Sequence, residues 1–177
     1  DTVTAQLQKA GRTKDIFKPY SDLYLQFLVT EVKPFIDKTF STKKDQKNTF
    51  VAGSSMGGLI SMYAICEYPK VFGKAACIST HWPILFNNDI AGPSDGVRKY
   101  FAENIPKAGD HEIYFDYGTE TLDQFYEVHQ KKVDEIMKLK KYKMGKNWVT
   151  KKFDGAAHNE KSWQERLPII LKFLFKQ

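Results

Sequence analysis

Apolar residues along this chain follow two patterns, short continuous runs and longer segments in which they recur every three to four residues. Short apolar runs are typical of buried strands and predict strands over residues 49–52 and 74–79, and two further strands are predicted over 111–117 and 147–153. The longer spacing predicts helices over about 22–38, 59–68, 122–140 and 162–175, with a brief helix at about 95–104. Because strands and helices alternate, the pattern predicts an α/β fold with a mostly parallel sheet and helices on both faces.

The first predicted strand ends in Gly53-Ser-Ser-Met-Gly-Gly58, which contains G-x-S-x-G, and a helical pattern opens directly behind it. In this strand–turn–helix context a serine nucleophile stands on a sharp, strained turn. The two glycines of G-x-S-x-G are expected to leave room for that turn, and Gly58 to let the helix approach the strand. The Met56 backbone N–H would then point at a tetrahedral oxyanion. The motif therefore predicts Ser55 as a catalytic nucleophile.

A serine nucleophile needs a histidine base and a carboxylate that orients the base. In the α/β-hydrolase order, the acid and then the histidine follow the serine, each in a loop at the carboxyl end of a strand. The loop after strand 111–117 carries Glu120 and Asp123, and the loop after strand 147–153 carries His158. His158 is therefore the predicted base. Both carboxylates stay open as the acid, with Asp116, inside the strand, as a weaker third.

The other three histidines are expected to have different roles. His111 opens a strand at the opposite end of the sheet and His129 lies in a Lys-rich helix, so both are predicted to be solvated. His81 follows strand 74–79 in a loop on the predicted active-site side, where it is expected as a pocket wall or an ordinary loop residue.

Charge and composition narrow the function classes. The formal net charge is +6, and the lysines bunch between residues 131 and 152. Apolar residues recur at helical spacing among them, which favours an amphipathic helix with a solvated basic face over a nucleic-acid surface. Cys66 and Cys77 are predicted to be buried thiols rather than a disulfide or a metal pair. No apolar run approaches the roughly 20 residues that span a bilayer, and no metal or organic cofactor is predicted.

Further motifs follow one another over about residues 20–175. They are Tyr24-x-x-Phe27-Leu28, Glu31-Val-Lys-Pro-Phe-Ile-Asp37, the Gly53–Gly58 elbow, Tyr68-Pro-Lys-Val-Phe-Gly73, Gly118-Thr-Glu120 and Gly155-Ala-Ala-His158-x-Glu160-x-x-Trp163-x-x-Arg166-Leu167. With these motifs the chain resembles the Putative esterase branch of the α/β-hydrolases. That branch includes feruloyl and acetylxylan esterases, enterochelin-esterase-like proteins, S-formylglutathione hydrolases and the mycolyltransferases.

The resemblance implies roles for individual residues. It implies Ser55 as nucleophile, His158 as base and the Met56 N–H as one oxyanion donor. Aligning the residues after the Gly-Thr-Glu motif places Asp123 at the position of the catalytic acid. The loop of this chain then has two residues more than the family pattern, and this difference keeps Glu120 as an alternative. Trp82 matches an aromatic-rich loop that often borders the substrate pocket, so Trp82 is expected either there, together with His81, or as an ordinary surface or core tryptophan.

The same resemblance concerns the extent of the domain. Members of the family place several strands before the elbow, and a loop among them gives the second oxyanion N–H. This chain shows no clear strand before residue 49, and residues 1–20 are typical of a loop. Residues 1–177 are therefore expected to form a single α/β-hydrolase domain that is N-terminally incomplete, with a further N-terminal segment of the same protein packed beside it.

The leading functional hypothesis is a serine carboxylic-ester hydrolase that forms an acyl-enzyme. By resemblance alone, its substrates are expected to be small-molecule or glycan esters, carbohydrate-linked or of related polar molecules. The alternative is a non-catalytic hydrolase-like module that binds glycans or a protein. A third hypothesis is acyl transfer to a sugar acceptor through the same serine.

Overall fold

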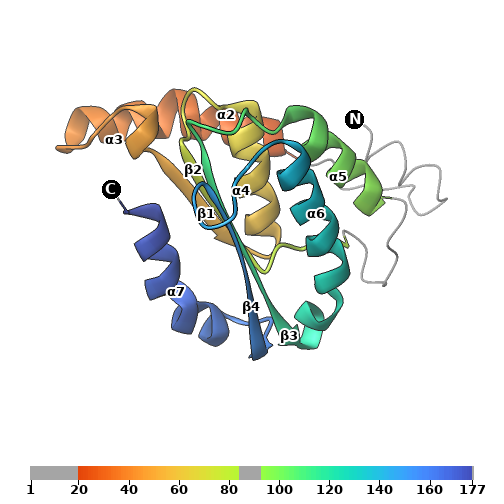
Figure 1. Cartoon of the computed structure of the whole chain (residues 1–177). Helices are drawn as coiled ribbons and strands as arrows, with labels where there is room; N and C mark the ends of the chain where they lie inside the picture. Colours follow the sequence, from red (N-terminus) through yellow and green to blue (C-terminus); the bar gives the residue numbers. More distant parts are fainter. Residues whose placement is uncertain (1–19, 84–92, 177) are drawn as a thin grey trace, which may run out of the picture.

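The computed structural model describes residues 20–83 and 93–176. Its centre is one parallel sheet of four strands in the order β1-β2-β3-β4 (Figure 1). The strands are β1 Phe50–Ser54, β2 Lys74–Ile78, β3 Glu112–Glu120 and β4 Trp148–Ala157. The main helices are α2 Ser21–Phe27, α3 Lys33–Thr39, α4 Met56–Glu67, α5 Pro93–Asn104, α6 Glu127–Leu139 and α7 Glu160–Leu174. The predicted α/β fold and parallel sheet are confirmed.

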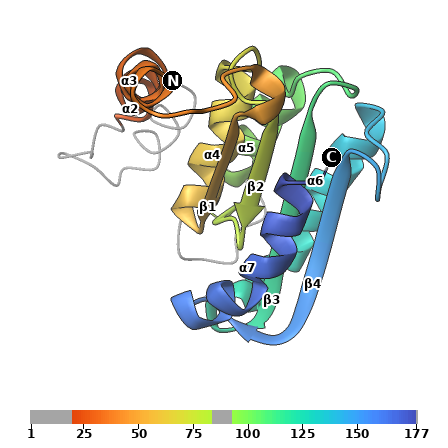
Figure 2. The same ribbon diagram turned by 90° about the vertical axis from the view of Figure 1, so that its left-hand side faces the viewer.

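Helices cover both faces of the sheet. In Figures 1 and 2, α4, α5 and α6 lie on one face and α7 lies alone on the other. The larger apolar core fills the space under α4 to α6 and includes Ile65, Phe101, Phe115 and Trp148. A smaller core around Tyr114 and Phe173 lies under α7. The inner strands β2 and β3 are buried on both faces and carry mostly apolar residues, whereas the outer strands β1 and β4 include exposed residues.

The predicted helix 22–38 is divided into three parts. A π-helical turn, Leu28–Val32, separates α2 from α3. Pro34 has no N–H, so it cannot bond the carbonyl of Thr30 as an ordinary helical residue would. The helix is therefore distorted in the turn just before the proline.

The last strand is longer than predicted. The sequence indicated a loop from Asp154 to His158, whereas β4 runs on to Ala157. Gly118 pairs with Phe153 and Glu120 pairs with Ala157, so extra residues of β4 bulge between the two pairs. Gly155 has a φ of 76°, which suits a glycine at such a bulge. The bulge carries His158 back to the end of β3.

Several buried side chains bear on the sequence predictions. Cys66 and Cys77 are free, buried thiols, as predicted. The prediction of solvated histidines is wrong for both His111 and His129, which are 7% and 0% exposed. His129 lies on the inner face of α6 with Val133 and Met137, so its position on the helix outweighs the basic composition around it.

Two observations concern the edges of the fold. β1 is an edge strand of the described sheet, and the expected strands ahead of it stay a prediction. Across residues 20–83 and 93–176, none of the helices combines the length and the apolar character that a bilayer crossing requires.

Candidate active site

The turn between β1 and α4 holds Ser55 in a strained conformation. Its φ is 58° and its ψ is −119°, a region that costs a non-glycine residue about 1–3 kcal/mol. A Cβ at Gly53 would lie 2.5 Å from the Gly57 carbonyl oxygen, and one at Gly58 would lie 2.7 Å from Thr80 Oγ1. Both glycines are therefore required by close packing. Gly57 differs from the expectation, because a Cβ there would meet no described atom within 4 Å.

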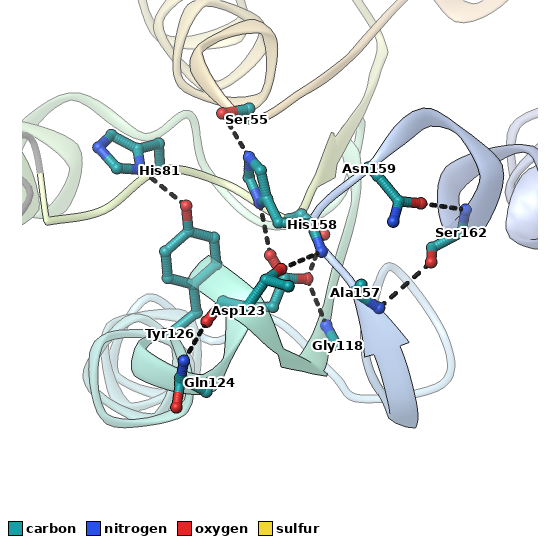
Figure 3. A network of polar contacts seen from close by, with 12 residues as sticks. Ser55, His81, Gly118, Asp123, Gln124, Tyr126, Ala157, His158, Asn159 and Ser162 are labelled. Carbon is teal, nitrogen blue, oxygen red and sulfur yellow. Dashed lines mark hydrogen bonds and ion pairs between the residues drawn. The ribbon is translucent and has the colours of Figure 1, made fainter.

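His158 connects the serine to a carboxylate. Its Nε2 lies 2.9 Å from Ser55 Oγ, and its Nδ1 lies 2.6 Å from Asp123 Oδ1 (Figure 3). When Nδ1 carries the ring proton, it donates a hydrogen bond to the carboxylate. Nε2 then has no proton and can accept a hydrogen bond from the serine hydroxyl. The three residues follow the carboxyl ends of β1, β3 and β4, which parallel strands bring to one edge of the sheet.

The two candidate acids lie in different environments. Asp123 is 0% exposed and sits in a 3₁₀ turn, Thr121–Phe125, that folds back beneath His158. Its Oδ2 accepts hydrogen bonds from the Gly118 N–H at 2.6 Å and from Ser79 Oγ at 2.5 Å. Glu120 ends β3 and is exposed, and its side chain has no hydrogen bond to a described residue. The structure therefore brings Asp123, and not Glu120, to His158.

Neighbouring groups fix the orientation of the imidazole. The Tyr126 ring lies edge-on to it at 5.6 Å, and the Trp163 ring lies edge-on from another direction at 5.0 Å. The backbone N–H of His158 donates to Thr121 Oγ1 at 2.8 Å. Thr121 lies in the loop between Glu120 and Asp123 and has a φ of 54°. Through Thr121 this loop closes against His158.

The predicted oxyanion donor lies at the start of α4. Met56 is the first residue of this helix, and its side chain is 59% exposed. The first N–H groups of a helix have no carbonyl within the helix to bond, and the helix dipole adds partial positive charge there. The Met56 N–H follows directly after Ser55, which is the position that an oxyanion donor of a nucleophile elbow takes.

The two predicted substrate contacts are both buried. Trp82 is 1% exposed, packs on Phe101 and Phe115, and donates from Nε1 to Gln130 Oε1 at 3.0 Å. The structure therefore favours the alternative of a core tryptophan over a place at a pocket border. His81 is 4% exposed, and its Nδ1 lies 2.7 Å from the Tyr126 hydroxyl. Burial, with a smaller effect of His158, lowers the pKa of His81.

A second buried carboxylate lies close to the first. Asp116 accepts a hydrogen bond from the Tyr114 hydroxyl at 2.9 Å, and its Oδ1 lies 3.3 Å from Arg166 Nη1. Burial raises the pKa of Asp116 to about 6, and Arg166 opposes that rise. Neither Arg166 nor Ser79, which contacts Asp123, was singled out for a role from the sequence. The available signals were the position of Ser79 at the end of a buried strand and of Arg166 on the face of α7 that carries Ile170.

Two further features of the described residues bear on other possible sites. A hollow of about 410 Å³ lies between β4 and α7 and is lined by Lys152, Phe153, Asp154, Gly155, Ala156, Ser162, Glu165 and Arg166. It includes none of Ser55, Asp123 and His158. Across residues 20–83 and 93–176, no three His, Cys, Asp or Glu side chains gather in a way that could hold a metal ion.

Solved structures of three esterases or hydrolases share this arrangement of strands and helices. A ferulic acid esterase matches with a TM-score of 0.65 and 19% identity, over 85% of this chain and 60% of that one. Enterochelin esterase from Shigella flexneri matches with a TM-score of 0.69 and 18% identity, over 86% and 37%. S-formylglutathione hydrolase from Staphylococcus aureus matches with a TM-score of 0.62 and 16% identity, over 89% and 64%.

This chain thus spans less than two thirds of the length of each of these three proteins. At such identities the likeness shows the α/β-hydrolase fold. A family model adds a direct match of the sequence. The model described as "Putative esterase" matches residues 9–174, and the chain therefore belongs to that family.

Proposed function

We propose that this chain carries the catalytic centre of a serine carboxylic-ester hydrolase that works through an acyl-enzyme. The observation that carries the proposal is the continuous series of contacts from Ser55 Oγ to His158 Nε2 and from His158 Nδ1 to Asp123 Oδ1, at 2.9 and 2.6 Å. Family membership and the esterase structures support the same reaction class.

In the first half-reaction, Ser55 Oγ attacks the ester carbonyl carbon while His158 Nε2 accepts the hydroxyl proton. The negative charge that develops on the carbonyl oxygen is stabilised by the Met56 N–H. When the tetrahedral intermediate collapses, the bond to the alcohol oxygen breaks. His158 then gives its proton to that oxygen, and the acyl group stays on Ser55.

In the second half-reaction, water attacks the acyl carbon and His158 accepts its proton. Collapse of the new intermediate breaks the bond to Ser55 Oγ, which recovers the proton, and the carboxylic acid leaves. Asp123 keeps the imidazole in the Nδ1–H tautomer and stabilises the imidazolium that forms in both halves.

For the substrate, we propose esters of carbohydrates or related polar molecules. The support is the family and the presence of a ferulic acid esterase and an enterochelin esterase among the similar structures. Trp82 and His81 are buried, so neither supports a choice of acyl group.

The test is hydrolysis of p-nitrophenyl acetate by the wild-type protein and by Ser55→Ala. We expect turnover by the wild type and a loss of at least about 10³-fold in the variant. A folded wild-type protein without turnover would contradict the proposal and favour a glycan- or protein-binding module. Product analysis with a sugar acceptor present separates hydrolysis from acyl transfer.

A further inference from the structure

The hydroxyl of Ser79 lies directly behind the proposed acid. Ser79 follows β2, has a φ of 40° and is 0% exposed. Its Oγ lies 2.5 Å from Asp123 Oδ2, 3.1 Å from Trp163 Nε1 and 3.0 Å from Arg166 Nη2. Three segments that are far apart in the sequence, the end of β2, the loop that carries Asp123 and α7, therefore meet at one oxygen atom.

The chemistry of the three partners fixes the direction of each hydrogen bond. Indole and guanidinium nitrogens can only donate, and a hydroxyl offers two acceptor positions and one proton. Trp163 and Arg166 therefore occupy the acceptor positions of Ser79 Oγ. Its single proton is left to point at Asp123 Oδ2.

The partners of Ser79 are themselves held in place. Arg166 is 2% exposed, lies 3.3 Å from Asp116 and donates from Nε to the Ser162 carbonyl at 3.2 Å. The Ser79 backbone N–H donates to two oxygens of Asp116, the main-chain carbonyl oxygen at 3.0 Å and Oδ1 at 3.1 Å. A buried guanidinium is thereby joined to both buried carboxylates, directly to Asp116 and through the Ser79 hydroxyl to Asp123.

Trp163 connects this cluster to the base. Its Nε1 donates to Ser79, and its ring lies edge-on to the His158 imidazole at 5.0 Å. The Trp163 side chain therefore contacts both the Ser79 hydroxyl, which holds Asp123, and the His158 imidazole, which Asp123 holds. A shift of Ser79 would alter the acid and the base together.

We propose that Ser79 is a positioning residue of the catalytic centre: its hydroxyl, oriented by Arg166 and Trp163, holds Asp123 so that Oδ1 faces His158 Nδ1. This inference rests on the proposed function. The Gly118 N–H supplies the second hydrogen bond to Oδ2, so loss of the hydroxyl removes one of two constraints. The effect belongs to the chemical step, because Ser79 is fully buried and has no surface for substrate.

A purely structural role makes a different prediction. Ser79 has a positive φ, which glycine adopts without strain and alanine does not. Serine already carries this strain through its Cβ, so if only the backbone conformation matters, Ser79→Ala keeps the strain of the wild type, Ser79→Gly relieves it, and neither variant is impaired. If the hydroxyl matters, both variants are impaired alike. Ser94→Ala is the matched control, because Ser94 is also a fully buried serine and its hydroxyl donates to the Pro83 carbonyl.

The experiment measures kcat and KM for p-nitrophenyl acetate in the wild type, Ser79→Ala, Ser79→Gly, Ser94→Ala and Ser55→Ala. Both Ser79 variants are expected to lose about 10- to 100-fold in kcat with KM within about twofold, the size of one lost hydrogen bond to a charged group. Ser94→Ala is expected to keep its kcat. Ser79→Gly near wild type, or a loss confined to KM, would overturn the inference.

A readout that does not need turnover separates this inference from the proposed function. The proton between His158 Nδ1 and Asp123 is expected as a downfield proton NMR resonance, which His158→Gln identifies by removing it. The resonance is expected to move upfield or broaden in Ser79→Gly and to persist in Ser94→Ala. An inactive wild type would refute the esterase proposal, and an unchanged resonance in Ser79→Gly would refute the positioning role.

Discussion

Replacing Asp123 with asparagine changes one oxygen to an NH₂ group and leaves the shape of the side chain intact. Two donors, the Gly118 N–H and the Ser79 hydroxyl, face Oδ2 at 2.6 and 2.5 Å. The Gly118 N–H cannot turn into an acceptor, so the amide must place its oxygen there. The NH₂ group is then directed at His158 Nδ1, 2.6 Å from the present Oδ1.

This orientation reverses the tautomer of the imidazole. An NH₂ group at Nδ1 requires that nitrogen to accept, which moves the ring proton to Nε2. A protonated Nε2 at 2.9 Å from Ser55 Oγ cannot accept the serine proton. In serine proteases the corresponding change lowers kcat by about 10⁴-fold. We expect a loss of about 10³- to 10⁴-fold here, equivalent to about 4–5.5 kcal/mol in the activation free energy.

The assay compares kcat for p-nitrophenyl acetate in the wild type, Asp123→Asn and Glu120→Gln at neutral pH. Glu120→Gln is the matched control, because it makes the same chemical change in the exposed candidate of the same loop. Its kcat is expected within about twofold of the wild type, as for most surface substitutions. Asp123→Asn with more than about a tenth of the wild-type kcat would refute this role of Asp123. A larger loss of kcat in Glu120→Gln than in Asp123→Asn would refute it as well.

Three further predictions follow from buried groups. Burial and nearby Arg98 lower the pKa of His129 to about 4 from 6.5, so only the unfolded chain takes up a proton between these values. The free energy of unfolding should therefore fall by up to about 3 kcal/mol as the pH drops through this window, and urea titrations of His129→Gln should show a shallower fall. A Cβ at Gly118 would lie 2.0 Å from the Ala156 carbonyl oxygen. Gly118→Ala should therefore lower the free energy of unfolding, measured by urea titration, by about 3 kcal/mol. A decrease of less than about 1 kcal/mol would contradict this close packing. Burial raises the pKa of the Cys66 and Cys77 thiols, so both should resist Ellman's reagent until the protein unfolds.

Much of the fold and part of the site could be predicted from local patterns. The elbow was predictable because its strand, glycines and helix are neighbours in the sequence. The choice between Glu120 and Asp123 was not, because it depends on the positive φ of Thr121 and the 3₁₀ turn behind it. Spacing along a loop does not reveal how far that loop folds back.

The cluster behind the acid shows a second limit. Ser79 and Arg166 are 87 residues apart, and only the sheet and α7 bring them together. His129 is different, because a usable signal was present. It precedes Val133 and Met137 at four-residue intervals, which places all three on one helical face, and the surrounding lysines led to the wrong prediction of a solvated ring.

The central claim is that Ser55 is a nucleophile activated by His158. Its most direct test is covalent labelling of the folded protein with a fluorophosphonate, followed by peptide mass spectrometry, in the wild type, Ser55→Ala and His158→Gln. We expect one adduct in the wild type, on the peptide that contains Ser55. Labelling should be much slower in His158→Gln and absent in Ser55→Ala. An unlabelled folded wild type, or an adduct that persists in Ser55→Ala, would contradict it.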